Sequence, residues 1–206
     1  MLAWGLLSVI ALVPVWGAAI YNRLVQLRNR IAYAFGQIDV QLKRRHGLVT
    51  NLVEVARAYL AHEAATLEAV IRARGLGQAA GATARAQPTN ANSVKALAVA
   101  EGALGSSLGR LMAVAENYPD LKADATMKSL SEDLTSTENR LGFARQAYSD
   151  QVLDFNNEAT QFPDLIVAWL LGFAPAAMLE ATVSEAERAA PQGALLSAWS
   201  KRFLTP

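Results

Sequence analysis

The chain has 206 residues, contains no cysteine and carries a formal net charge of +1. Without cysteine it has no disulfide, thiolate nucleophile or iron–sulfur cluster, and a charge near zero argues against a nucleic-acid partner. Abundant alanine and few β-branched runs favour helix, and no segment alternates with the period of a strand. The sequence therefore predicts an all-α protein.

The first predicted element is a run of 19 residues without a charged side chain, Leu2 to Ile20. As a helix the run would extend for about 28 Å, close to the thickness of the hydrocarbon core of a bilayer. A cleaved signal peptide has a basic region before its apolar run, and none precedes this one. We therefore predict a single-pass transmembrane helix over residues 1–20; a cleaved signal and a buried soluble helix are the alternatives.

Aromatic and basic residues mark the two ends of this run. Trp4, Trp16 and Tyr21 suit the headgroup level of a membrane, and Arg23 and Arg28 lie close enough to the run to contact anionic headgroups. Because basic flanks stay on the cytoplasmic side, we expect the N-terminus outside and the body of the protein in the cytoplasm.

The body begins with a long helical pattern. Apolar residues recur every three or four positions from Asn22 to about Arg74, the a/d pattern of a coiled coil or of a helix that buries one face. No proline interrupts this stretch, so we predict one helix of roughly 50 residues that continues from the anchor. Glycine, proline and asparagine residues then interrupt the pattern over residues 75–92, which predicts a flexible loop.

Two more long helices are predicted, over about residues 94–117 and 121–161. Three long helices with short or flexible connections predict an antiparallel up-and-down bundle, one domain over residues 21–190. The uncharged stretch 165–178 predicts a short helix across the bundle end, or else an interfacial or partner-docking segment. Its candidate docking residues are Phe162, Trp169, Leu170 and Phe173. Residues 191–206 are expected to form a poorly ordered tail.

Motifs for chemistry are weak in this chain. Gly105 to Gly109 fits G-x-S-x-G, but a nucleophile elbow needs a strand before the serine, and this segment is predicted helical. His62-Glu63 lacks the second histidine of H-E-x-x-H. We interpret the run Lys43 to His46 as a solvated helix face. The sequence thus predicts no enzyme activity, no catalytic or metal-binding residue and no cofactor.

Several blocks of sequence resemble the LemA family of bacterial membrane-anchored helical proteins. The blocks lie at residues 21–29, 37–46, 51–54, 59–63, 73–74, 111–123, 138–141, 144–148, 162–163 and 172–173. The resemblance implies one N-terminal span and a bundle of long helices, with no established activity or cofactor. One branch of the family is similar to proteins needed for magnetosome membrane formation; we do not expect this chain in that branch, whose N-terminal extension is longer.

Together these observations predict a non-enzymatic, membrane-tethered scaffold or membrane-organising protein. It would lie in the bacterial inner (cytoplasmic) membrane and contact the lipid bilayer, an unidentified envelope protein or further copies of itself. The alternative is an accessory or regulatory subunit of an envelope protease or stress-response system. The two functions differ in the class of partner, which the sequence does not identify.

Overall fold

The computed structural model describes the backbone of residues 2–179 and the side chains from Pro14 to Leu179. The helices in this range are α1 (Leu2–Tyr59), α2 (Ala64–Ala86), α3 (Ala91–Ala115), α4 (Pro119–Ala123), α5 (Ala125–Thr160) and α6 (Asp164–Leu170). This part of the chain has no strand, which confirms the all-α prediction. The predicted tail over 191–206 lies outside the described residues.

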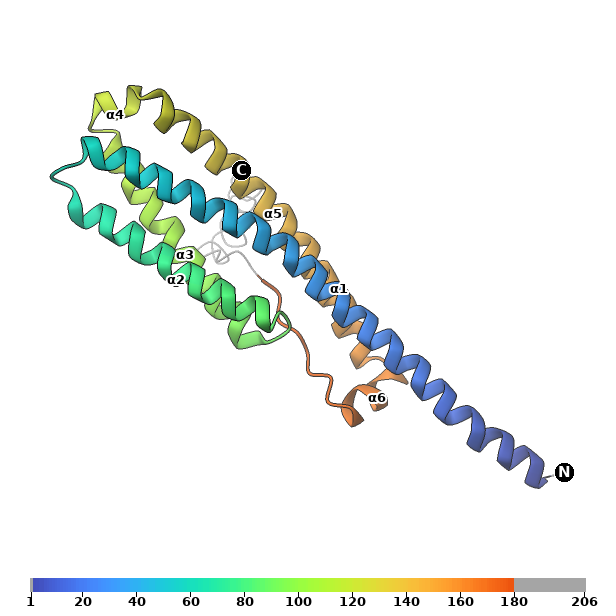
Figure 1. The fold of residues 1–206 in the computed structure, drawn as a ribbon. Coiled ribbons are helices and arrows are strands. Elements are labelled where there is room, and N and C mark those ends of the chain that lie inside the picture. Colours follow the sequence, from blue (N-terminus) through green and yellow to red (C-terminus); the bar gives the residue numbers. More distant parts are fainter. Residues whose placement is uncertain (1, 180–206) are drawn as a thin grey trace, which may run out of the picture.

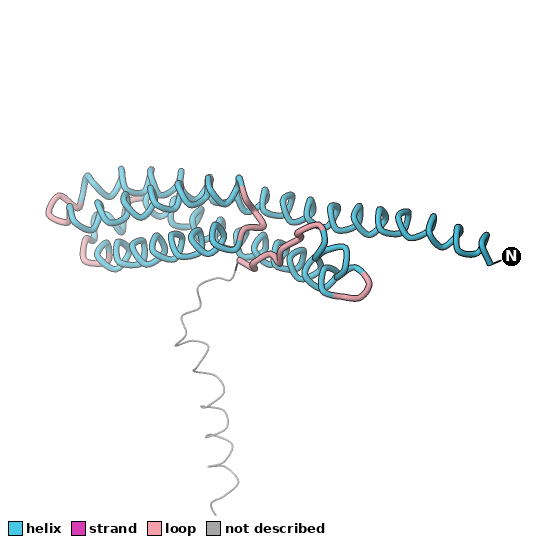
Figure 2. The backbone as a smooth tube through the Cα atoms, turned by 90° about the horizontal axis from the view of Figure 1, so that it is seen from below, coloured by secondary structure: helices cyan, strands magenta, loops and turns pink. Residues whose placement is uncertain are grey.

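Four long helices, α1, α2, α3 and α5, lie side by side and alternate in direction (Figure 1). α1 packs mainly along α5, and α2 packs mainly along α3. The short helix α6 contacts both α1 and α5 at one end of the bundle. Beyond α6, the N-terminal part of α1 extends alone, away from every other helix (Figures 1 and 2).

The prediction of one unbroken helix from Asn22 to Arg74 is wrong, because α1 ends at Tyr59 and α2 starts at Ala64. The turn between them is closed by the Glu63 amide, which donates to the Leu60 carbonyl at 3.1 Å. No residue between Leu60 and Leu67 is buried, so the apolar stripe is interrupted there. Because the chain reverses direction at this interruption, α2 can bury Leu67 in the same core as α1. Tertiary packing therefore determines where α1 ends.

The predicted flexible loop over 75–92 is also wrong for most of its length. α2 continues to Ala86, and only the connection from Gln87 to Asn90 is non-helical. Gly77 and Gly81 are buried where α2 meets its neighbours, and a Cβ at Gly77 would lie 2.7 Å from Glu101 Oε1. Glycine costs up to about 1 kcal/mol inside a helix, but here it allows a close approach between helices, as in other small-residue contacts.

The hydrophobic core has two parts, separated along the bundle by a layer of buried polar side chains. The part near α6 includes Leu24, Ile31, Phe35, Leu97, Tyr148 and Phe155. The distal part includes Val49, Leu52, Leu67, Leu104, Leu111 and Leu134. Arg45, His46, Glu101 and Thr137 are buried between the two parts. The bundle therefore combines two apolar clusters with one central polar layer.

The segment after α6 returns along the bundle in an extended path to Leu179. Asn156 on α5 holds it, because the Asn156 side chain accepts from the Ala176 amide and donates to the Ala176 carbonyl, both at 2.9 Å. Tyr148 Oη also lies 3.0 Å from the Ala177 carbonyl, and burial raises the pKa of Tyr148 to about 12. The helix predicted within 165–178 thus ends at Leu170.

Among the helices of the described part, α3 has the length and mean hydropathy that crossing a membrane would require. However, α3 packs on α2, and it buries Leu97, Leu104 and Leu111 together with Glu101 in the bundle. We therefore interpret α3 as a core helix. The transmembrane helix predicted over residues 1–20 belongs to the projecting part of α1 and stays a prediction.

Candidate functional site

In the part of the chain that the structure describes, exposed apolar side chains gather at the end of the bundle where α1 leaves it. We call this surface the apolar end face; it consists of Phe162, Leu165, Ile166, Trp169, Leu170 and Leu171, all exposed. The side chains of Phe162 and Trp169 are 81% and 82% exposed. Contiguous exposed apolar surface of this kind marks an interaction site in soluble and membrane proteins.

The opposite side of α6 packs onto the bundle. Asp164 and Ala168, one helical turn apart, are buried against it. Arg23 on α1 forms an ion pair with Glu158 on α5 and lies 3.8 Å from Asp164 Oδ2. These contacts orient α6 so that the face on the far side of the helix is left to solvent.

The predicted docking residues separate into two groups. Phe162, Trp169 and Leu170 belong to the apolar end face, whereas Phe173 is half-buried. The Phe173 ring makes an edge contact with Tyr21 at 6.0 Å between centroids and lies 6.4 Å from the Phe155 ring. Phe173 therefore joins the segment after α6 to α1 and α5, and leaves the outer face to the other residues.

Of the predicted membrane-interface residues, Trp16 lies on the projecting part of α1, whereas Tyr21, Arg23 and Arg28 lie where α1 meets the bundle. Trp16, Tyr21, Arg23 and Arg28 are all exposed, although Tyr21 and Arg23 also make the contacts with Phe173 and Glu158 described above. The Trp4 side chain lies outside the described ones. The exposed positions fit an interface with a membrane, and Trp16 is 48% exposed.

A second site, the central ionic cluster, lies inside the bundle and consists of Arg45, His46, Glu101 and Glu138. Arg45 Nη1 donates to Glu101 Oε2 at 2.5 Å, and Arg45 Nε lies 2.5 Å from Glu138 Oε1. His46 Nε2 lies 2.8 Å from Glu101 Oε1. Both Arg45 and Glu101 are only 4% exposed. The cluster therefore ties α1 to α3 through a charge pair that is shielded from water, and to α5 through Glu138, whose side chain is 39% exposed.

This finding corrects the interpretation of Lys43 to His46 as a solvated face. Lys43 and Arg44 are exposed, and Lys43 pairs with Asp39 one turn away at 2.9 Å. Arg45 and His46 instead point into the bundle. A run of four consecutive residues covers the whole circumference of a helix, so some of its members face the core.

The electrostatics of Glu101 follow from these contacts. Burial by itself would raise the pKa of the Glu101 carboxyl group. The hydrogen bond from His46 and the charge of Arg45 outweigh burial and hold the pKa of Glu101 below its ordinary value. Glu101 is thus ionised at neutral pH, and because a carboxylate only accepts, His46 Nε2 is the donor in their hydrogen bond.

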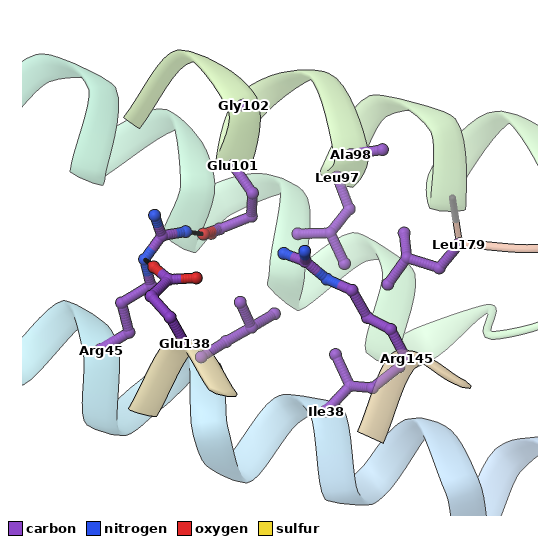
Figure 3. A pocket seen from close by; sticks show the side chains of 10 residues that line it. Ile38, Arg45, Leu97, Ala98, Glu101, Gly102, Glu138, Arg145 and Leu179 are labelled. Atoms are coloured by element: carbon purple, nitrogen blue, oxygen red, sulfur yellow. Dashed lines mark hydrogen bonds and ion pairs between the residues drawn. The ribbon is translucent and has the colours of Figure 1, made fainter. Parts of the chain in front are cut away.

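A cavity of about 180 Å³ adjoins the central ionic cluster (Figure 3). The guanidinium group of Arg145 points into it beside Leu97, and burial lowers the pKa of Arg145. Two arginines, Arg45 and Arg145, and two glutamates, Glu101 and Glu138, line the cavity, so the formal charges of its lining cancel. The lining brings together no nucleophile with a base, and the residues that the structure describes include no group of three or more potential metal ligands of the His, Cys, Asp and Glu types.

Glu101 is not among the sites predicted from the sequence, although the sequence contains a signal for it. Glu101 is the one acidic residue in α3, and it lies four residues after Leu97 and three before Leu104, within the buried stripe of that helix. A charge at a core position needs a partner. The signal therefore predicts a buried cation on a neighbouring helix, and Arg45 is that cation.

Gly77 on α2 packs against the central ionic cluster, so a larger residue at this position should destabilise the bundle. In Gly77→Ala the added Cβ would lie 2.7 Å from Glu101 Oε1 and 3.2 Å from His46 Nε2. Because the cluster must shift to make room, we expect the free energy of unfolding to fall by about 1–3 kcal/mol. Chemical denaturation of the purified protein measures this change.

Gly75→Ala is the matched control in the same helix. A Cβ at Gly75 has no neighbouring atom within 4 Å, so the substitution should raise the free energy of unfolding by about 0.5–1 kcal/mol through helix propensity. Equal effects of the two substitutions would contradict the packing of Gly77 against Glu101.

The structure thus places this protein in the class of antiparallel helical bundles, with one long projecting helix and an exposed apolar end. The profile of the LemA family matches residues 34–193, which is more than half of the chain. The chain therefore belongs to the LemA family, and the resemblance noted in its sequence is confirmed.

Curated relatives of the chain are magnetosome proteins from two bacteria. Magnetosome protein MamQ 2 of Paramagnetospirillum magneticum is 27% identical over 74% of the chain and 62% of the relative. Magnetosome protein MamQ of Magnetospirillum gryphiswaldense is 25% identical over 84% of the chain and 69% of the relative. The aligned part thus spans about three fifths of the length of the first relative.

Proposed function

We propose that this LemA-family protein is a membrane-tethered helical scaffold that acts through protein contacts and catalyses no reaction. The observation that carries the proposal is the continuity of α1 from Leu2 to Tyr59. The uncharged run and the first helix of the bundle are one helix. An anchor built in this way leads into the body without an intervening loop, so the bundle takes a defined position relative to the membrane.

The surroundings of the projecting part of α1 support a bilayer as its environment. Ile20 is the first buried residue among those described, and Val15, five residues earlier, is 67% exposed. No described helix packs on this part of α1 (Figures 1 and 2). A long uncharged helix without protein cover matches the length of a membrane span, and the exposure of Val15 argues against a buried soluble helix.

The comparisons add support for a membrane-associated helical protein. The family match covers the bundle, and the curated relatives are magnetosome proteins. The role of a scaffold at a membrane surface is our own proposal for this chain. Its partners would be an envelope protein or further copies of itself, in addition to the bilayer.

The proposed location is the inner membrane of a bacterium, with the N-terminus outside and the bundle in the cytoplasm. Three arginines, Arg23, Arg28 and Arg30, follow the uncharged run within ten residues. Basic flanks of this kind stay on the cytoplasmic side.

Thiol labelling tests the tether and its orientation, because the chain has no native cysteine. Gln87→Cys introduces a thiol at an exposed position between α2 and α3, and Ser8→Cys places one within the uncharged run. A membrane-impermeant maleimide should label Gln87→Cys only after the inner membrane is opened, and should leave Ser8→Cys unlabelled throughout. Labelling of Gln87→Cys while the inner membrane is intact and only the outer envelope is permeable would show the opposite orientation. Labelling of Ser8→Cys would exclude the tether.

Site-specific photo-crosslinking in cells tests the scaffold function. Tyr33 on α1 and Phe143 on α5 are exposed aromatic residues along the bundle, and each can be replaced by a photoreactive analogue. We expect reproducible capture of one envelope protein, or of a second copy of the chain, from a defined position. Absence of any specific protein adduct along the bundle would contradict a function through protein contacts.

A further inference from the structure

We propose that the apolar end face inserts into the headgroup region of the same bilayer that holds residues 2–20. The protein would then contact its membrane at two points, the anchor and α6. This inference rests on the proposed tether and adds a lipid-binding surface to it. Four observations support the inference: the orientation of α6, its level along α1, its charge balance and the chemistry of its side chains.

The first observation is the division of α6 into two faces. Asp164 and Ala168 are buried against the bundle, whereas Leu165, Ile166, Trp169 and Leu170 are exposed on the outer side. Phe162 and Leu171 extend this surface at the two ends of the helix. An amphipathic helix with aromatic and aliphatic residues on its free side is suited to lie in the plane of a membrane interface.

The second observation is the level of α6 along α1. The start of α6 lies beside Arg23, whose Nη1 is 3.8 Å from Asp164 Oδ2. The segment after α6 lies beside Tyr21 through the Phe173 ring. Tyr21 and Arg23 directly follow the uncharged run. With residues 2–20 in the hydrocarbon core, these two residues lie at the headgroups, and α6 lies at the same level.

The third observation is the charge balance at this end of the bundle. Exposed Arg23, Arg28 and Arg30 on α1 are matched by Asp154, Glu158 and Asp164 on α5 and α6. Attraction to anionic lipid is therefore weak, and burial of apolar surface provides the driving force. Insertion should occur in zwitterionic lipid and depend little on salt.

The fourth observation is the type of side chain at the centre of the surface. Trp169 is 82% exposed and belongs to the residue type most enriched where membranes meet water. A second contact beside α1 would restrict the tilt of the anchor and its rotation about its own axis. The bundle would then present the same flank to its partners in every copy.

Tryptophan fluorescence of the full-length protein in phosphatidylcholine vesicles tests the inference. Trp4→Phe, Trp16→Phe and Trp199→Phe together leave Trp169 as the single emitter. A second variant keeps Trp16 alone, as a reporter of the anchor. A third has all four tryptophans replaced by phenylalanine and carries Phe143→Trp at an exposed position along α5. Circular dichroism establishes that each variant is folded, and vesicles with brominated lipid quench any tryptophan in contact with lipid.

We expect Trp169 to be quenched to an extent similar to Trp16, and the emitter introduced by Phe143→Trp to remain unquenched. Quenching of Trp169 should be strongest with bromine close to the headgroup and should persist at high salt. Quenching of Trp16 without quenching of Trp169 would overturn the inference and leave the tether intact. Failure of both to be quenched would overturn the tether as well. Emission from Trp169 that is blue-shifted but unquenched would show that protein, such as a second copy, covers the apolar end face. That result would also overturn the inference.

Discussion

Glu101→Ala is expected to lower the free energy of unfolding by about 3–5 kcal/mol, the largest effect that we predict for a side chain of the bundle. The substitution removes the carboxylate that both Arg45 and His46 contact, at 2.5 and 2.8 Å. Arg45 would then be buried with Glu138 as its remaining ionic partner. Chemical denaturation followed by circular dichroism measures the change.

The control for this prediction is Glu132→Ala, on the exposed surface of α5. Removing that carboxylate should change the free energy of unfolding by no more than about 0.5 kcal/mol. Similar losses for the two glutamates would contradict a stabilising role of the central ionic cluster.

The same cluster predicts a dependence of stability on pH. Because the fold lowers the pKa of Glu101, the unfolded chain binds the proton first as the pH falls. The contribution of Glu101 to the free energy of unfolding is fully present above the ordinary carboxyl pKa of 4.5. It is lost as the pH falls from that value towards the lowered pKa of Glu101. Glu101→Gln should flatten this part of the stability profile; an unchanged profile would exclude Glu101 as its source.

Two lysines within the uncharged run should release the protein from the membrane. Ile10→Lys and Leu12→Lys lie near the middle of the run. Each lysine at the centre of a span costs about 2.5–3.5 kcal/mol of insertion free energy, or about 5–7 kcal/mol for the pair. We expect the wild-type chain to stay in the membrane fraction after alkaline extraction and the double variant to leave it.

The matched control carries the same added charge on the bundle. Leu76→Lys and Phe143→Lys replace exposed apolar residues of α2 and α5, and this variant should resist extraction like the wild type. Retention of the variant with Ile10→Lys and Leu12→Lys would contradict a transmembrane anchor in this run.

Much of the fold was predictable because helix formation follows the spacing of apolar residues. The stripe through Leu24, Ile31 and Leu42 is buried in α1, as its period requires. No proline or glycine marks the reversal after Leu60, so local sequence does not predict it; it is determined by the packing of Leu67 into the core. Gly75, Gly77 and Gly81 have the composition of a loop but lie in α2, and the role of Gly77 and Gly81 depends on a neighbouring helix that local sequence does not specify.

Of the two candidate sites, local sequence predicts the apolar end face but not the central ionic cluster. Exposure of Trp169 and Leu170 could be expected from an uncharged stretch at a bundle end, and the structure shows both residues exposed. The central ionic cluster joins residues 56 positions apart, Arg45 and Glu101. Local charge patterns do not reveal such a pair. The isolated acidic residue in the buried stripe of α3 was the available signal for it.

Hydrogen exchange of the full-length protein in lipid vesicles tests the central claim, that residues 2–20 lie in a bilayer as part of one helix with the bundle. From Pro14 to Ala19 every residue except the half-buried Gly17 is exposed. The helical hydrogen bonds here therefore gain little protection from the bundle, and exchange as slow as in the core requires lipid. We predict that peptides from residues 2–20 exchange as slowly as those from the core of α2. Complete exchange in the run while α2 stays protected would show that this part of α1 is open to water, and would contradict the tether.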